Sequence, residues 1–149
     1  MADERIATLG ATIFYSLGKI FLVFLALYTL SVIAMWRVFN KAGEKGWKSL
    51  IPVYNIYVLF NLFWSPTWFW LMLGVYYVLN VMLSGMANLV FMSVAIGFVF
   101  YLYCYINLMN RVAKSFGKGL AFTIGLIFLP NIFQLILAFN SAEYTKIED

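Results

Sequence analysis

The stretch I-F-L-V-F-L-A-L-Y-T-L-S-V-I-A-M-W, residues 20–36, contains no charged side chain and lies between Lys19 and Arg37. Together with the residues before it, it predicts a helix over residues 12–36, because about 20 apolar residues span the roughly 30 Å hydrocarbon core of a bilayer. Lys19 would cost about 2.5–3.5 kcal/mol at the bilayer centre, but a lysine near a helix end extends its ammonium toward the interface. The apolar run therefore outweighs this charge and predicts a membrane-spanning helix.

Three further apolar segments have similar lengths and cover residues 66–84, 87–110 and 119–140. The chain of 149 residues is 64% hydrophobic and only 11% charged, which is too little polar surface for a soluble globule of this size. We therefore predict an all-α integral membrane protein with four transmembrane helices in one transmembrane domain, residues 1–149. The acidic start, with Asp3 and Glu4, and the absence of an A-x-A step favour a retained first helix over a cleaved signal peptide.

Residues 49–64 are apolar but form a short segment that ends at Ser65 and Pro66. As an extra crossing, this segment would place the basic stretches 37–48 and 111–118 on opposite sides of the membrane, against the positive-inside rule. With four crossings, seven of the ten Lys and Arg residues lie on one side. We therefore predict a short interfacial or re-entrant helix on the cytoplasmic side, although an extra crossing stays open.

The same topology predicts an inner-membrane, multi-pass protein with both termini outside and the basic loops in the cytoplasm. Ser65 is then expected to cap the next helix, with Pro66 at its first position, where proline loses no hydrogen bond. All five tryptophans fall near the cytoplasmic interface, where the indole ring is favoured. They are Trp36, Trp47, Trp64, Trp68 and Trp70.

A short pattern recurs along the chain. Arg37-Val38, Lys41 and Lys45-Gly46 reappear as Arg111-Val112, Lys114 and Lys118-Gly119, each time after an apolar helix and before an apolar segment that contains proline. A parallel duplication would produce this echo. Convergence of two short basic, glycine-containing loops would produce it too.

Three motifs carry a family resemblance. They are W-R-V-F-N-K-A-G-E-K-G-W-K-S-L-I-P-V-Y-N at residues 36–55, A-K-S-F-G-K at residues 113–118 and G-L-I-F-L-P at residues 125–130. The chain in these parts resembles a family of small bacterial four-helix membrane proteins of unknown function, some of which are labelled signal peptidase I-like. The resemblance implies an architecture in a bacterial inner membrane, and that label is the sole basis for a third function, a membrane anchor related to signal-processing enzymes.

The residues do not fit signal peptidase chemistry, which uses a Ser nucleophile and a Lys base within a sizeable domain on the outer face. The predicted outer loop at residues 84–88 has no lysine, and Lys114 and Lys118 fall on the cytoplasmic side. The sequence contains no histidine, which removes the commonest general base and the usual metal ligand. All six carboxylates lie near the termini or in a loop, and no glycine-rich phosphate loop is present. We therefore expect no enzyme activity, no cofactor, no metal site and no nucleic-acid partner.

Uncharged polar residues remain within the predicted helices. The fourth predicted helix carries three of them on one face, and Pro130 frees a backbone carbonyl beside them. This polar cluster either forms structural hydrogen bonds between helices or lines a solute site. Its members are Asn107, Asn110, Thr123, Asn131 and Gln134.

Small residues four positions apart permit close approach between helices, either within the chain or between subunits. Such helix-contact positions are Ser93 and Gly97 on one predicted helix and Ala121 and Gly125 on the next. The sequence thus favours a non-enzymatic accessory or scaffolding subunit whose partners are the lipid bilayer and another membrane protein or itself. The alternative is a small channel or transporter for a neutral or anionic solute, with Asn107, Asn131 and Gln134 along the path.

Overall fold

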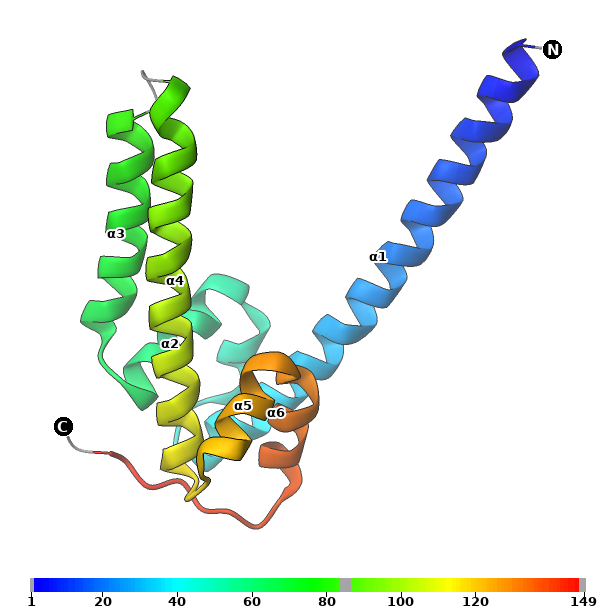
Figure 1. Cartoon of the computed structure of the whole chain (residues 1–149). Coiled ribbons are helices and arrows are strands. Elements are labelled where there is room, and N and C mark those ends of the chain that lie inside the picture. Colours follow the sequence, from blue (N-terminus) through cyan, green and yellow to red (C-terminus); the bar gives the residue numbers. More distant parts are fainter. Residues whose placement is uncertain (1, 84–86, 148–149) are drawn as a thin grey trace.

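The computed structural model describes residues 2–83 and 87–147, and every regular element in these ranges is a helix (Figure 1). The elements are α1 (Ala2–Lys41), the 3₁₀ helix η1 (Gly46–Leu50), α2 (Pro52–Phe63), α3 (Pro66–Leu83), α4 (Ala87–Ser115), α5 (Leu120–Phe128) and α6 (Pro130–Phe139).

Helix α1 is much longer than predicted. Its 40 residues rise about 60 Å, twice the thickness of a hydrocarbon core. Side chains at residues 8–27 are all exposed, and Tyr28 is the first that is partly buried. Among the described elements, α1 contacts only η1 and α6, so most of this apolar helix stands alone, as Figure 1 shows.

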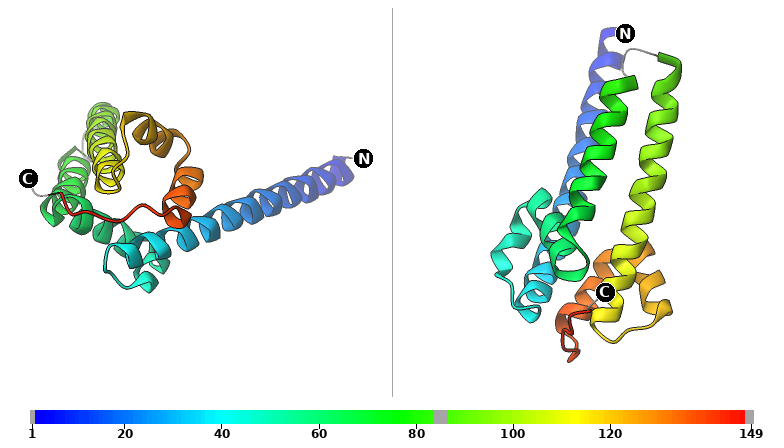
Figure 2. Two further views of the ribbon diagram at one scale, coloured as in Figure 1. Left: turned by 90° about the horizontal axis from the view of Figure 1, so that it is seen from below. Right: turned by 90° about the vertical axis from the view of Figure 1, so that its left-hand side faces the viewer.

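The core lies where the two long helices end. The C-terminal third of α1, the last turns of α4, and the short helices η1, α2, α5 and α6 contribute side chains to it, and we call this layer the base (Figure 2). The most deeply buried large apolar side chains of the base are Val38, Phe39, Phe60, Cys104, Leu126 and Leu137. Cys104, in α4, is a free and buried thiol.

Helices α3 and α4 form an antiparallel hairpin that rises from the base toward the same side as α1 (Figures 1 and 2). The Thr67 amide donates to Ser65 Oγ at 3.3 Å and Pro66 is the first helical residue, which confirms the predicted cap. Residue 84, the predicted end of this first hairpin helix, lies outside the described residues, and α4 continues five residues beyond the predicted Asn110.

The prediction of one membrane-spanning helix over residues 119–140 is wrong. The chain forms two short helices, α5 and α6, that pack against each other, with Phe122 and Phe133 in edge-to-face contact at 5.0 Å. The break is at Leu129, because Pro130 has no amide hydrogen to continue the ladder and takes the first position of α6 instead.

This break also changes where the chain goes next. The Thr145 amide donates to the Ser115 carbonyl at 2.8 Å, so the C-terminal segment lies beside the end of α4 and its basic loop. The predicted position of the C-terminus, across the membrane from this loop, depended on one continuous helix over residues 119–140, and the chain forms two helices there instead.

Within the described residues, the stretches Thr8–Lys41 and Phe91–Ser115 are long and apolar enough to cross a membrane. The ambiguous segment 49–64 is divided between η1 and the 12-residue α2, which at about 18 Å is too short for an extra crossing.

Gly46 is required by the packing of η1 on α1, because a Cβ at this position would overlap the Trp36 ring. We predict that Gly46→Ala lowers the free energy of unfolding by about 1–3 kcal/mol, the usual cost of overpacking. Gly119→Ala is the control, since nothing lies within 4 Å of a Cβ there. Thermal melts in detergent give the comparison, and equal melting temperatures for the two variants would contradict the packing argument.

Candidate functional site

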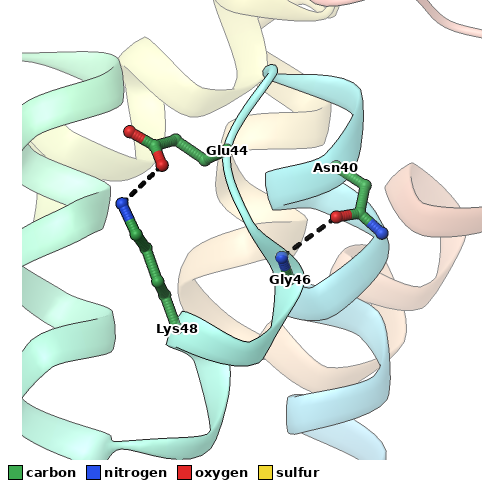
Figure 3. Close-up of polar contacts among 4 residues, drawn as sticks. All are labelled: Asn40, Glu44, Gly46 and Lys48. Carbon is green, nitrogen blue, oxygen red and sulfur yellow. Dashed lines mark hydrogen bonds and ion pairs between the residues drawn. The ribbon is translucent and has the colours of Figure 1, made fainter.

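The loop between α1 and η1 is held by its own backbone and two side chains. Gly43 adopts φ +80°, and the Glu44 amide donates to the Phe39 carbonyl at 2.8 Å, which closes a Schellman motif. The Gly46 amide donates to Asn40 Oδ1 at 3.0 Å, as Figure 3 shows. The basic loop is therefore ordered from within.

Glu44 and Lys48 form an ion pair in this loop, with 2.5 Å between Oε2 and Nζ (Figure 3). The hydrogen bond from Lys48 is the main cause that lowers the pKa of Glu44 below its usual range, and the same bond raises the pKa of Lys48. The pair leaves the net charge of the loop positive, because Arg37, Lys41 and Lys45 have no such partner among the described residues.

Basic side chains at the end of α1 attach it to the end of α6. Lys41 Nζ donates to the Leu137 and Asn140 carbonyls at 2.7 and 2.6 Å, which supplies partners for carbonyls that a helix end leaves without one. A cation there also opposes the partial negative charge of the α6 C-terminus. The Arg37 guanidinium lies over the Phe139 ring, 4.4 Å from its centroid.

The end of α4 is attached to α2 in a comparable way. The Arg111 guanidinium lies 5.2 Å from the centroid of the Trp64 ring, at the C-terminus of α2. The Tyr144 hydroxyl donates to the Leu62 carbonyl at 2.8 Å, and burial raises the pKa of this phenol. Each long helix thus ends with an arginine stacked on an aromatic ring that closes a short proline-initiated helix.

Aromatic rings form a continuous chain of contacts that joins η1 and α2 to the start of α3 and to α4. The Trp47 ring stacks on Tyr54, and the Trp64 ring stacks on Trp68 with 4.6 Å between the centroids. The chain runs through Trp47, Tyr54, Tyr57, Phe69, Phe60, Trp64, Trp68 and Tyr103. A band of aromatic rings beside basic loops is typical of a membrane interface.

A family model recognises the part of the chain that follows α1. Residues 47–147 match the model of a family of unknown function, DUF5684. The chain belongs to this family. The match supports the resemblance to a family of unknown function, and the family description names no activity. Comparisons with curated proteins and with solved structures each gave no significant match.

The DUF5684 segment begins at Trp47 and so leaves out α1, although Val38 and Phe39 of α1 are buried in its core. No group of three or more His, Cys, Asp or Glu side chains within the described ranges is arranged to hold a metal ion.

The residues of the predicted polar cluster lie within the DUF5684 segment, and those with a hydrogen bond have different partners. Asn107 Nδ2 donates to the Tyr103 carbonyl of its own helix at 2.8 Å, and Thr123 is buried with its hydroxyl 3.5 Å from the Gly119 carbonyl. Gln134 Oε1 accepts from the Ser31 hydroxyl at 3.2 Å, which joins α6 to α1. Asn110 and Asn131 are partly buried.

The predicted small-residue positions contact other parts of the same chain. A Cβ on Gly97 would lie 3.6 Å from the Tyr76 ring, so this stripe, with the buried Ser93, faces α3. Gly125 lies against the Phe133 ring of α6, where a Cβ would overlap the ring, and Ala121 is exposed.

Several contacts of the base were missed from the sequence. The carbonyl that Pro130 frees is that of Leu126, and the Tyr105 hydroxyl donates to it at 3.4 Å. The buried Ser49 hydroxyl contacts the Gly46 and Val32 carbonyls. A signal for both was present, because tyrosine and serine within apolar runs need partners once buried.

The Glu44–Lys48 pair predicts a pH effect with a defined sign. A carboxyl whose pKa is lowered on folding stabilises the native state above its unfolded pKa near 4.5, and this contribution is lost as pH falls through the lower folded value. We expect Glu44→Gln to cost about 0.3–1 kcal/mol near pH 7, as for other partly exposed pairs. The difference from the unmodified protein should shrink as the pH falls below 4.5 in chemical unfolding series. A difference that grows over that range would contradict the pairing.

Proposed function

We propose that this protein is a non-enzymatic membrane protein that acts as an accessory or scaffolding subunit, either in a homo-oligomer or with another membrane protein. The observation that carries the proposal is the unaccompanied part of α1. Residues 8–27 are exposed on all sides and cover about 30 Å, the length of one bilayer crossing. The hairpin helix α4 has α3 beside it, whereas α1 has no neighbour along this length among the elements that the structure describes.

In the proposed topology, α1, α3 and α4 cross a bacterial inner membrane and the base faces the cytoplasm. The C-terminal segment then shares the side of the basic loops because of its bond to Ser115. Lys146 joins the seven basic residues of the two loops, so eight of ten Lys and Arg lie on the cytoplasmic side, which agrees with the positive-inside rule better than four crossings do.

The alternative of a small channel or transporter has less support. Asn107 is bonded to its own helix and Gln134 to Ser31, and a path through the bilayer needs a continuous polar lining. An enzyme is likewise disfavoured, because the sequence has no histidine and its one cysteine is buried.

Cysteine labelling tests the topology. In a Cys104→Ser background, we expect Lys45→Cys and Ser141→Cys to react with a membrane-impermeant maleimide only after the cells are permeabilised, since both positions are exposed on the base side. Labelling at position 141 in intact cells, with position 45 protected, would instead support a fourth crossing by residues 119–140.

Glycine substitutions on α1 test the scaffold proposal. A Cβ on Gly18 has nothing within 4 Å in the chain, so Gly18→Leu leaves the fold intact and removes only a place for close approach by a partner helix. We expect a species larger than the monomer in native mass spectrometry after mild extraction, weakened at least about tenfold by Gly18→Leu, or ~1.4 kcal/mol.

Gly74→Leu is the matched control, since it lies on the exposed face of α3 and has nothing within 4 Å either. Gly97→Leu and Gly125→Leu are unsuitable, because their side chains would meet Tyr76 and Phe133 of the same chain. If only monomer appears in several mild detergents and in nanodiscs, the scaffold proposal fails.

A further inference from the structure

A groove runs along α1 where that helix enters the base. It has a volume of about 420 Å³ and almost wholly apolar walls. We call it the α1 groove, and its lining residues are Tyr28, Thr29, Val32, Ile33, Trp36, Arg37 and Leu50. Tyr28 and Arg37 mark its two ends, about 13 Å apart at the rise of an α-helix. The Tyr28 hydroxyl donates to the Leu50 carbonyl at 2.9 Å and fixes η1 against α1 at the upper end.

Arg37 gives the α1 groove a charged end. Its side chain is exposed, and stacking on Phe139 satisfies one face of the guanidinium but supplies no anion. Among the described residues, no carboxylate lies within ion-pair distance of Arg37, and Glu44, the acidic residue of the loop that follows α1, is paired with Lys48. A guanidinium presents five N–H donors in a fork that fits phosphate. Arg37 therefore offers a phosphate-binding group at this end of the groove.

We propose that the α1 groove binds an anionic phospholipid of the cytoplasmic leaflet, with its phosphate on Arg37 and an acyl chain along Ile33 and Val32 toward Tyr28. The directions agree. The charged end adjoins the basic loop and Trp36, and the apolar end leads to the exposed part of α1 that lies in the bilayer in the proposed topology. Basic pockets on the cytoplasmic side of membrane helices bind such headgroups for the same reason.

Charge and shape together select a phospholipid over a free phosphate ion. Inorganic phosphate would use Arg37 alone, with no gain from the apolar walls, whereas a lipid with a zwitterionic headgroup would use the walls and gain little from Arg37. An anionic phospholipid uses both parts of the site.

The experiment measures lipid binding by the full chain in mild detergent, so it does not depend on the scaffold proposal or on topology. Native mass spectrometry follows the first adduct during titration with dioleoyl phosphatidylglycerol or dioleoyl phosphatidylcholine. We expect tighter binding of phosphatidylglycerol. Arg37→Gln should weaken it about fivefold, the effect of one surface cation, and abolish the preference. Arg37→Lys should retain most of it.

Two further variants separate the groove from general charge. Lys114→Gln removes an exposed charge from the base outside the groove and should change binding less than twofold. Ile33→Trp keeps Arg37 but fills the groove at an exposed position, and it should weaken the first adduct of both lipids. Millimolar inorganic phosphate should not displace the lipid.

Circular dichroism and gel filtration test whether each variant is folded. If Arg37→Gln does not fold, lipid binding by Ile33→Trp tests the groove instead. The proposal is overturned by equal binding of the two lipids, by equal losses in Arg37→Gln and Lys114→Gln, or by unchanged binding in Ile33→Trp. Displacement by phosphate would show that Arg37 binds an anion without using the groove.

Discussion

The base depends on two glycines that end the long helices in the left-handed backbone conformation. Gly43 and Gly117 have φ values of +80° and +65°, a region that costs other residues about 1–2 kcal/mol. At each glycine, the next amide turns back to a carbonyl of the last helical turn, so the chain leaves the helix axis at once. Without these stops, η1 could not lie along α1, and α5 could not lie beside α4.

The contacts that follow these stops are reciprocal. Helix α1 packs on α6 and α4 packs on α2, so each long helix is held by a short helix that follows the other one. Arg37 lies over Phe139 as Arg111 lies over Trp64, and the buried pairs Met35 and Met109, and Val38 and Val112, have the same spacing to their glycines. The echo in the sequence therefore corresponds to equivalent positions in the fold, which is what a parallel repeat requires.

Apolar runs were sufficient to predict α1, α3 and α4, and Ser65 with Pro66 placed the start of α3, because length and capping are local properties. Residues 119–140 were not predictable in this way. Pro130 is compatible with a kinked crossing and with two separate helices, and the choice depends on distant partners such as Tyr105, Lys41 and Ser115. The candidate site residues had the same difficulty: Gly97 and Gly125 were recognised as contact positions, but the rings they contact are set by tertiary structure.

Helix α1 has two parts with different roles, although both are apolar: its last third packs in the base, and residues 8–27 lie outside it. Its last third supplies Val38, Phe39 and Lys41 to the base, so the DUF5684 segment needs it for a complete core although the family match starts at Trp47. Its residues 8–27 contribute nothing to that core, since all of them are exposed. An apolar helix gains no hydrophobic stabilisation from a partner while lipid surrounds it, so only close packing favours association. Residues 8–27 of α1 can therefore change their contacts without destabilising the base. Residues of α1 after Tyr28 cannot, because they pack in its core.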